Sequence, residues 1–345
     1  MPKRVTWLTL ATKVPMGQQT YEVAIQEAVR AIAGPQWAFD ANTVGSWRTD
    51  ATTRIPAKLL KLPATAAAVG RWAGRGADLV HRFDLRIPGP GRAHVVTAHD
   101  LPPMRFPDEG SMPSWAQRPL GDVKVICPSE FAASELADLL GARDITVVPY
   151  GVRASFQHPE AQTPDELRTL GIRQPFFVHA AGATQRKNLT GLAEAWRSAV
   201  GALPDHQLVL LGPPHPRRDE LFAGLPNTVL PGRIPLDSVG RVMAAAEAVV
   251  VPSIYEGFGL PALEGMAVGT PVIAVDRGAL PEVCLDAALM VEPDGAGIAA
   301  AILAVGRHEV DRDALIDAGL RRAATFSWEK AAREHLRVYE SVVND

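Results

Sequence analysis

The chain has 345 residues, of which 47% are hydrophobic and 21% charged, a globular composition that excludes a disordered or collagen-like protein. Since domains usually run to about 100–200 residues, this length favours two domains. The two cysteines, Cys127 and Cys284, lie in apolar stretches, which excludes a disulfide scaffold and favours a reducing compartment. No segment approaches the roughly 20 apolar residues of a membrane span, and the apolar run at residues 5–11 suits a first strand better than a signal peptide. We therefore expect a cytoplasmic protein.

The net charge of -3 is unevenly spread along the chain. Residues 1–150 carry 17 Lys and Arg against 14 Asp and Glu, whereas the remainder carries 18 against 24. Much of the positive excess lies between Arg48 and Arg92, where nine basic residues accompany three acidic ones. A solvated helix face is the simpler explanation, and peripheral contact with anionic lipid at the inner face of a membrane, or with an acidic acceptor, is the alternative. Few aromatic residues are interleaved with these charges, so nucleic-acid binding is not favoured.

Short apolar runs alternate with helical patterns along the whole chain. In the first part we expect strands at residues 5–11, 77–83, 93–99, 123–129 and 145–151, with helices at 21–33 and 130–140. The polar, proline-containing stretch at 151–164 breaks this rhythm and predicts a domain boundary. A second series follows, with strands at 175–182, 206–212, 227–232, 248–253, 270–276 and 287–293, and helices at 189–202, 236–246 and from Pro261.

This alternation predicts two Rossmann-like, doubly wound α/β domains with parallel sheets. We expect the first at residues 1–155 and the second at 156–325, facing each other across a central cleft. A last helix with Ser327 as its N-cap, in the segment 326–345, is expected to pack back toward the first domain. In sheets of this kind, ligands bind beyond the carboxyl ends of the strands.

The strongest signal for function is the stretch VVVPSIYEGFGLPALEGMAVGTPVIAV, residues 249–275. A buried strand leads into a loop with Glu256, Gly257 and Gly259, and Pro261 then opens a helix at a position that tolerates proline. Free N–H groups and the positive end of the dipole bind phosphate at a helix N-terminus, and glycines let the backbone approach closely. Glu264, in the first turns of that helix, can accept two hydrogen bonds from a ribose diol. A pair of acids placed for the helix dipole is the structural alternative.

This stretch resembles the donor-site signature of glycosyltransferase family 4, with two glutamates separated by seven residues. The segment HAAGATQRKNLTGLAEAW, residues 179–196, is similar to the family's glycine loop and Arg-Lys-Asn motif. DITVVPYGV resembles its interdomain crossover, AHDLPPMRFP its N-domain histidine loop, and SWEKAAREHLRVYESV its closing helix. The resemblance covers almost the whole chain and implies the GT-B fold, with an acceptor-side domain first and a nucleotide-sugar domain second.

The resemblance also implies roles for residues of the second domain. Arg186 and Lys187 lie where the family places two cations on the donor diphosphate, and fixed cations stabilise the negative charge that grows on a leaving phosphate. Glu256 is implied to contact the transferred hexose, and Glu264 the nucleotide ribose. Many members carry arginine where this chain has Ala183. The remaining donor contacts are implied at the glycine loop, the base-pairing backbone and the glutamate loop, namely at Gly182, Ala183, Ile234, Gly257, Phe258, Gly259 and Leu260.

In the first domain the resemblance implies that His99, at the end of a strand, lies near the transferred hexose. A histidine at the carboxyl end of a strand can hydrogen-bond a substrate hydroxyl, and the spacing to DLPPMRFP favours this role over the alternative of a satisfied core histidine. Gly17 resembles the glycine turn after the first strand, which admits the donor phosphate or the acceptor, and a simple turn is the alternative.

Metal ligation finds no support in the sequence, because no paired cysteines, His-x-x-x-His cluster or Asp-x-Asp at a strand end stands out. No P-loop and no G-x-G-x-x-G turn is present either, which argues against ATPase and NAD-dependent enzymes. We expect no cofactor and no metal, with Arg186 and Lys187 replacing the divalent ion.

The resemblance thus implies a retaining hexosyltransferase that takes its sugar from a nucleotide diphosphate sugar. GATQRKNL resembles the form common among mannosyl- and rhamnosyl-like transferases, which favours a GDP-mannose-like donor, with a UDP-sugar second. The acceptor is expected to be a hydroxyl of a glycan, a glycolipid or a small metabolite. A sugar-nucleotide epimerase of the same fold and a non-catalytic nucleotide-sugar binding protein are the alternatives.

Overall fold

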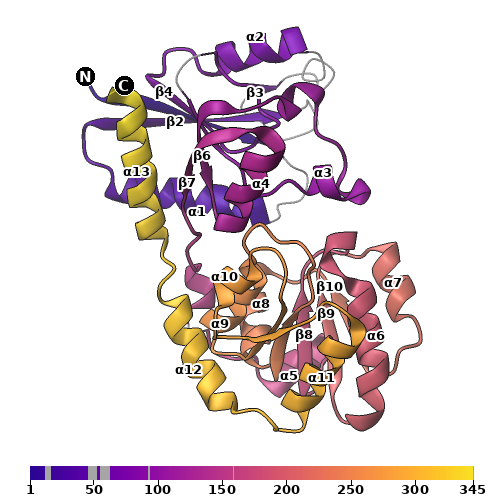
Figure 1. Ribbon diagram of the computed structural model, residues 1–345. Coiled ribbons are helices and arrows are strands. Elements are labelled where there is room, and N and C mark those ends of the chain that lie inside the picture. The colour runs from indigo at the N-terminus through magenta and orange to yellow at the C-terminus, as the bar shows by residue number, and fades with distance from the viewer. Residues whose placement is uncertain (12–16, 46–52, 55–62, 92–93, 158, 345) are drawn as a thin grey trace. The chain divides into compact units, whose positions relative to one another are not determined.

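The computed structural model describes residues 1–11, 17–45, 53–54, 63–91, 94–157 and 159–344. The chain divides into two compact units, of which the first comprises Met1–Gly151 with Ser327–Asp345 and the second Val152–Phe326 (Figure 1). The predicted fold class is confirmed, because each unit is built on a parallel sheet covered by helices.

The sheet of the first unit has seven parallel strands in its described part, in the order β3-β2-β1-β4-β5-β6-β7. The chain runs from β1 outward to β3 and then returns to place β4 on the other side of β1. This reversal of strand order is a topological switch point, where open α/β sheets bind ligands. The strands are β1 Lys3–Leu10, β2 Trp37–Gly45, β3 Thr53–Arg54, β4 Leu79–Arg82, β5 His94–Thr97, β6 Gly121–Cys127 and β7 Ala142–Val147.

Five α-helices belong to the described part of the first unit. Helix α1 places Tyr21, Ile25 and Val29 four residues apart on one buried face, the spacing of an amphipathic helix. Helix α4 is stopped at both ends, because the Ser129 side chain accepts from the Ala132 N–H and Gly141 adopts the left-handed conformation. The helices are α1 Gly17–Ile32, α2 Pro63–Ala73, α3 Pro102–Arg105, α4 Glu130–Leu140 and α13 Trp328–Asn344, with 3₁₀ turns at Pro107–Glu109 and Ser114–Gln117.

The last helix, α13, is fastened to the first unit by buried hydrogen bonds (Figure 1). Trp7 Nε1 on β1 donates to the Tyr339 hydroxyl at 3.1 Å, and His81 Nδ1 on β4 lies 2.6 Å from the same hydroxyl. The hydroxyl of Tyr21 lies 2.9 Å from Nε2 of His335. Residues near the two ends of the chain therefore share one core.

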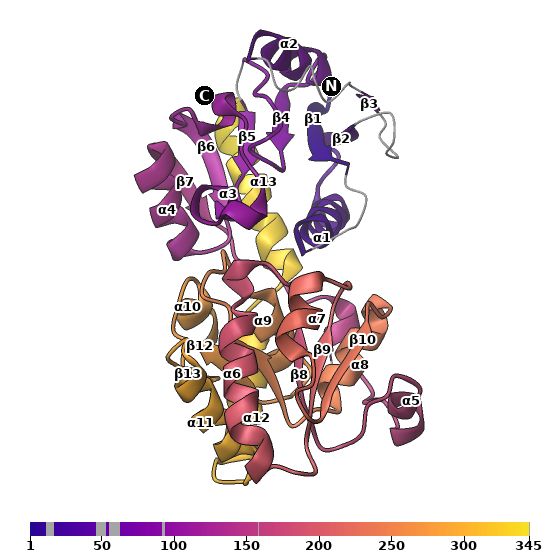
Figure 2. The ribbon, with the colours of Figure 1, turned by 90° about the vertical axis from the view of Figure 1, so that its right-hand side faces the viewer.

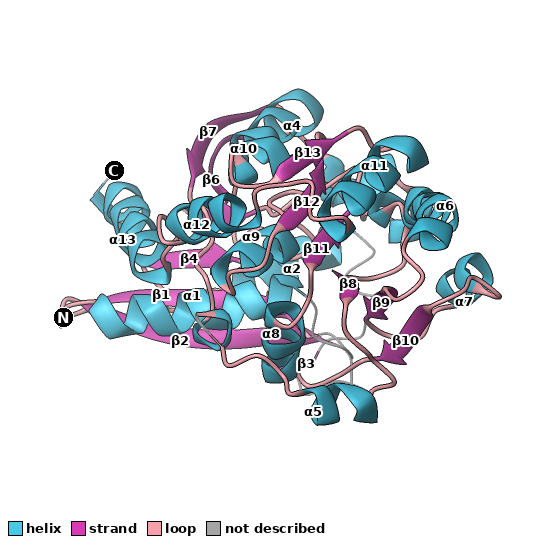
Figure 3. Cartoon of the chain, turned by 90° about the horizontal axis from the view of Figure 1, so that it is seen from below, coloured by secondary structure: helices cyan, strands magenta, loops and turns pink. Residues whose placement is uncertain are grey.

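The sheet of the second unit has six parallel strands in the order β10-β9-β8-β11-β12-β13, visible side by side in Figure 3. Its switch point lies between β8 and β11, so the loops that follow these two strands leave the same edge as neighbours. The strands are β8 Phe176–Ala180, β9 Gln207–Leu211, β10 Thr228–Gly232, β11 Ala248–Val251, β12 Val272–Val275 and β13 Leu289–Val291.

Helices cover the sheet of the second unit, with α6 packed against α11 and α9 against α12 (Figure 2). The helix predicted at 189–202 ends earlier than expected as an α-helix, because its last turn tightens into 3₁₀ geometry. The helices are α5 Pro164–Thr169, α6 Leu189–Ala199, α7 Pro216–Phe222, α8 Leu236–Ala244, α9 Leu260–Ala267, α10 Leu280–Cys284, α11 Gly295–Gly306 and α12 Arg312–Ala323, with 3₁₀ turns at Ala154–Phe156, Gln185–Lys187 and Val200–Ala202.

Candidate active site

The two loops at the switch point of the second unit bring three of the predicted site residues together. Lys187 Nζ lies 2.6 Å from Oε1 of Glu256, and Arg186 Nη1 lies 3.1 Å from Oε2 of the same carboxylate. Lys187 and Glu256 are buried, and the Arg186 side chain is only 17% exposed. Lys187 and Arg186, which precede Glu256 by 69 and 70 residues in the sequence, thus form one cluster with it.

The backbone ties the two loops to each other as well. The N–H of Ile254 donates to the Arg186 carbonyl at 2.9 Å, and Arg186 Nη1 reaches the Tyr255 carbonyl at 3.3 Å. The Glu256 carbonyl accepts from the N–H of Ala279 at 3.0 Å. Gly278 lies so close that an added Cβ would be 2.9 Å from both the backbone nitrogen and oxygen of Glu256. The backbone at Glu256 is therefore fixed by contacts with the loop of Arg186 and with residues 278–279.

The charges of this cluster do not balance, since two cations face one carboxylate. Burial opposes the charged form of Glu256, but Lys187 and Arg186 outweigh it and lower the pKa of this carboxyl to about 2. Glu256 is consequently ionised at neutral pH, so the three side chains of the cluster together carry a formal charge of +1. A net positive, largely buried cluster at a sheet edge suits an anionic ligand such as a diphosphate.

The glycine loop that follows Glu256 leads into helix α9 at a glycine with positive φ. Gly259 is the N-cap with a φ of 100°, and no side chain caps this helix end. A Cβ at Gly259 would also come 2.6 Å from the Leu280 side chain, so glycine is required by both conformation and space. Pro261 occupies the first turn, as predicted. Gly257, Phe258, Gly259 and Leu260 thus run from the carboxylate to the positive end of α9.

Glu264 lies on α9 but forms its ion pair elsewhere, with Nη2 of Arg153. Burial raises the pKa of Glu264, and the guanidinium of Arg153 opposes that rise. The ion-pair partner of Glu264 is therefore Arg153, which lies outside the cluster of Arg186, Lys187 and Glu256. Sequence reasoning missed Arg153, whose signal was weak: a lone cation just after the predicted crossover strand.

The remaining predicted donor residues lie in loops of the second unit. Gly182 and Ala183 follow β8, where Ala183 is buried, and Ile234 follows β10 and is half-buried. Each lies beyond the carboxyl end of its strand, the edge at which sheets of this kind bind ligands.

In the first unit, His99 lies two residues beyond the end of β5. Its Nδ1 is hydrogen-bonded to the Tyr150 hydroxyl, and its ring contacts Tyr21 edge-on with 4.8 Å between ring centroids. Burial lowers the pKa of His99 to about 4, although Asp84 opposes that shift, so the imidazole is neutral at pH 7. Its Nε2 is buried and has no hydrogen-bond partner among the described residues. Gly17 is the exposed first residue of α1.

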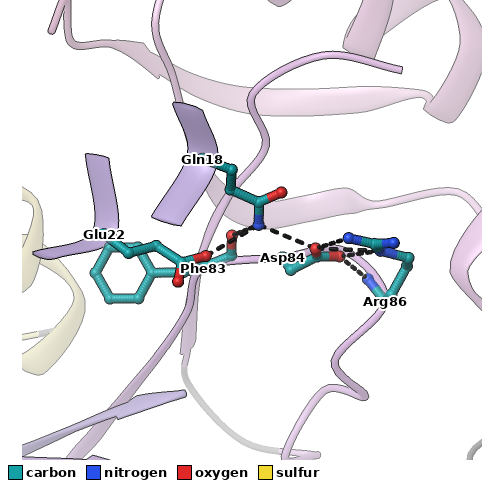
Figure 4. Close-up of polar contacts among 5 residues, drawn as sticks. All are labelled: Gln18, Glu22, Phe83, Asp84 and Arg86. Atoms are coloured by element: carbon teal, nitrogen blue, oxygen red, sulfur yellow. Dashed lines mark hydrogen bonds and ion pairs between the residues drawn. The ribbon is translucent and has the colours of Figure 1, made fainter. Parts of the chain in front are cut away.

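A polar cluster that sequence reasoning missed surrounds the switch point of the first unit (Figure 4). Gln18 Nε2 on α1 lies 2.9 Å from Oε1 of Glu22 and 3.0 Å from Oδ2 of Asp84, which follows β4. Arg86 donates to both oxygens of Asp84, with Nη2 at 2.6 Å from Oδ2. Burial raises the pKa of the Glu22 carboxyl to about 8, with Gln18 opposing and Asp84 adding to the shift. The cluster is therefore close to neutral at pH 7.

The basic region between Arg48 and Arg92 does not form a continuous charged surface in its described part. Arg82 is buried and bonds the Ile87 carbonyl, and Arg86 is paired with Asp84. Arg82 is therefore buried rather than solvated, whereas Arg86, although paired with Asp84, keeps 45% of its side chain exposed. Arg71 and Arg75 are exposed at the end of α2. Four basic residues of the region, Arg48, Lys58, Lys61 and Arg92, lie outside the described residues.

Across the described ranges, no group of three or more His, Cys, Asp and Glu side chains could hold a metal ion. None of the helices in the part of the chain that the structure describes has the length and hydropathy to cross a membrane.

Two doubly wound parallel sheets with ligand-binding loops at their switch points are the elements of a GT-B fold, and comparison with known proteins identifies this fold. Residues 174–308 match the family Glycosyl transferases group 1. The chain is 30% identical over 295 residues to the alpha-maltose-1-phosphate synthase of Mycolicibacterium smegmatis, covering 73% of this chain and 74% of that protein. It is 26% identical to the phosphatidyl-myo-inositol mannosyltransferase of Mycobacterium leprae, over 95% of this chain and 94% of the relative. The crystal structure of Anabaena HepE in complex with UDP-glucose superposes with a TM-score of 0.77 at 16% identity, over 98% and 99% of the two chains.

The chain therefore belongs to the group 1 glycosyl transferases. It is a hexosyltransferase that uses a nucleotide-sugar donor, and the predicted family resemblance is confirmed.

Proposed function

We propose that the chain transfers a hexose from a nucleotide diphosphate sugar to a hydroxyl acceptor with retention of configuration at the anomeric carbon. The observation that carries the proposal is the cluster of Arg186, Lys187 and Glu256, in which two largely buried cations face one carboxylate. A leaving diphosphate gains negative charge as the glycosidic bond breaks, and a fixed excess of positive charge stabilises it.

In this proposal each residue has a separate task. Arg186 and Lys187 hold the diphosphate, and the backbone from Gly257 to Leu260, which ends at the N-terminus of α9, adds N–H groups and the positive helix end. Glu256, ionised because of its two cations, accepts hydrogen bonds from the hydroxyls of the hexose. The acceptor hydroxyl gives its proton to the leaving phosphate oxygen on the same face from which it attacks. No protein nucleophile is required, and the two cations take the place of a divalent metal.

The roles of Glu264 and His99 rest on the family resemblance together with their chemistry. Glu264 would accept from the ribose hydroxyls, with Arg153 holding its buried carboxylate in place. His99, neutral at pH 7 and with its Nδ1 engaged by Tyr150, would use Nε2 toward a hexose hydroxyl.

For the donor base we propose guanine first and uracil second, and for the acceptor a hydroxyl of a glycan, a glycolipid or a small metabolite. The GATQRKNL segment and the similarity to a mannosyltransferase support a GDP-mannose-like donor. The UDP-glucose in a structural neighbour keeps UDP-sugars second. The near-neutral cluster of Gln18, Glu22, Asp84 and Arg86 supports an acceptor recognised through hydroxyls rather than through a strong charge.

A nucleotide screen followed by product analysis tests this function. A ligand that binds only the folded state raises the melting temperature, and we expect the largest rise with GDP and a smaller one with UDP. The matching nucleotide hexose, supplied with and without hydroxyl acceptors and with EDTA throughout, should release its nucleotide and keep the anomeric configuration in the product by NMR. No thermal shift with any nucleoside diphosphate would overturn the donor site. An inverted product would overturn the stereochemistry, and product formation only after adding a divalent metal would overturn the role given to the two cations.

A further inference from the structure

A buried arginine on helix α7 contacts the start of the loop that carries Arg186 and Lys187. Arg218 on α7 is 2% exposed, and its guanidinium spans two backbone carbonyls. Nη2 donates to the Ala181 carbonyl at 2.6 Å, and Nη1 donates to the Pro213 carbonyl at 2.9 Å. Ala181 is the first residue after β8, so this contact fixes the point at which the glycine loop leaves the sheet.

Other backbone contacts hold Ala181 in the same place. Its N–H donates to the Leu211 carbonyl at the end of β9, at 3.3 Å. The next residue of that strand end, Gly212, has a φ of 142°, and a Cβ added there would lie 2.3 Å from the Ala181 oxygen and 2.8 Å from Nη2 of Arg218. A side chain at this position would occupy the space of the hydrogen bond itself. Gly212 thus leaves the space in which Arg218 donates its hydrogen bond to the Ala181 carbonyl.

Burial lowers the pKa of Arg218, and the neighbouring carboxylate of Asp219 offsets only part of that shift. Arg218 forms no ion pair with the described residues, and its guanidinium donates to two neutral carbonyls. A buried cation without a carboxylate is costly unless a ligand or hydrogen bonds compensate it. The neighbouring acid Asp219 is exposed. Burial lowers the pKa of His179 on β8 to about 4, and the charges of Arg218 and Lys187 add to this shift.

We propose that Arg218 is a positioning residue for the donor diphosphate: it clamps the start of the loop that ends in Arg186 and Lys187, and its unpaired charge adds to the positive field there. This inference rests on the proposed function, since it assumes that the loop holds a nucleoside diphosphate. Two hydrogen bonds to two separate segments require the planar fork of arginine, whereas lysine supplies the charge from a single point.

Isothermal titration of the full chain with GDP and UDP tests the proposal. Arg218→Met, which removes charge and fork, should weaken binding of the preferred nucleotide about tenfold, a loss of about 1.4 kcal/mol. Arg218→Lys should recover part of that loss, which a purely packing role would not produce. The exposed Arg197 on α6 provides the matched control, and Arg197→Met should bind the nucleotide as the wild type does.

A second variant reaches the same carbonyl without touching the arginine. Gly212→Ala places a methyl group against the Ala181 oxygen and should also weaken nucleotide binding, so it decides the matter if Arg218→Met fails to fold. The inference is overturned if folded Arg218→Met protein binds the nucleotide with wild-type affinity. If Arg218→Met does not fold, wild-type nucleotide affinity of folded Gly212→Ala protein overturns it instead. If the wild type binds neither GDP nor UDP, the proposed function fails instead. If Arg186→Ala abolishes binding while the Arg218 variants do not weaken it, only the inference fails.

Discussion

The two units place polar clusters at equivalent points of their sheets, yet the charges of the clusters differ. At the switch point of the second unit, two cations share one carboxylate, whose pKa falls to about 2. At that of the first unit, Arg86 is matched by Asp84, and burial raises the pKa of the third group, Glu22, to about 8. One edge thus keeps a positive excess and the other is close to neutral. The fold supplies two similar edges, and the side chains decide which ligand each edge suits.

The largest effect should come from removing one cation of the positive cluster. Lys187→Ala takes away the closer partner of Glu256 and half of the charge proposed to stabilise the leaving phosphate. We expect turnover to fall about 10²–10³-fold, the size seen when one preorganised electrostatic group is lost. Initial rates of nucleotide release from the preferred donor measure it, and Lys330→Ala on the exposed surface of α13 is the control. Unchanged turnover in a folded Lys187→Ala protein would contradict the proposal that positive charge at the switch point of the second unit stabilises the leaving phosphate.

The second effect concerns the other glutamate of the donor signature. Arg153→Met leaves the buried carboxyl of Glu264 without its cation, and we expect a loss of about 3 kcal/mol in the free energy of unfolding. Combining this change with Glu264→Gln should restore most of the stability, because no charge then remains buried alone. Urea unfolding of the four proteins in the cycle measures the coupling. Equal losses in the single and double variants would mean that packing around Arg153, rather than its charge, matters.

The smallest effect is a pH dependence in the neutral cluster. Glu22 has a pKa of about 8 in the folded chain against 4.5 for an ordinary glutamate, so the folded state retains a proton that the unfolded state releases between these values. The stability that depends on this proton is present below pH 4.5 and is lost as the pH rises to 8. Glu22→Gln removes the titration, and we expect it to be more stable than the wild type by about 2 kcal/mol at pH 9, with a smaller difference at pH 5.

Urea unfolding of the full chain at both pH values provides the measurement. Glu27→Gln is the matched control, since Glu27 lies exposed on the same helix. A difference between Glu22→Gln and wild type that stays constant from pH 5 to pH 9 would contradict the raised pKa. The near-neutral character of the first edge would then need another explanation.

Much of the fold was predictable because buried parallel strands leave long apolar runs in the sequence. The strands around β1, β8 and β11 are dense in Val, Leu and Phe, and the structure confirms them. Strand β2 escaped notice because WAFDANTVG mixes polar residues into a partly exposed strand, which has no continuous apolar run. Helix α7 was also missed, since its seven residues are too few for a clear helical period.

The candidate site was predictable only where a motif carries it. Arg186, Lys187 and Glu256 lie in two distinctive segments, and the switch point brings those segments together. Arg153, Arg218, Gln18 and Asp84 stand alone in the sequence, and the contacts Arg153–Glu264, Arg218–Ala181 and Gln18–Asp84 join residues 111, 37 and 66 positions apart. Pairing at such separations depends on tertiary structure, and no local pattern records it.

Helix α13 has a consequence for the order in which the chain can fold. The second unit is one continuous stretch, whereas the first unit is completed only by residues 327–345. Synthesis from the N-terminus therefore delivers the whole of the second unit before Tyr339 can meet Trp7 and His81, 332 and 258 residues earlier in the chain. Closing so long a loop is entropically costly, but a second unit that has already folded shortens it to a compact insert. Once the second unit has folded, it can therefore help the first unit to fold by bringing residues 327–345 close to the N-terminal part of the chain.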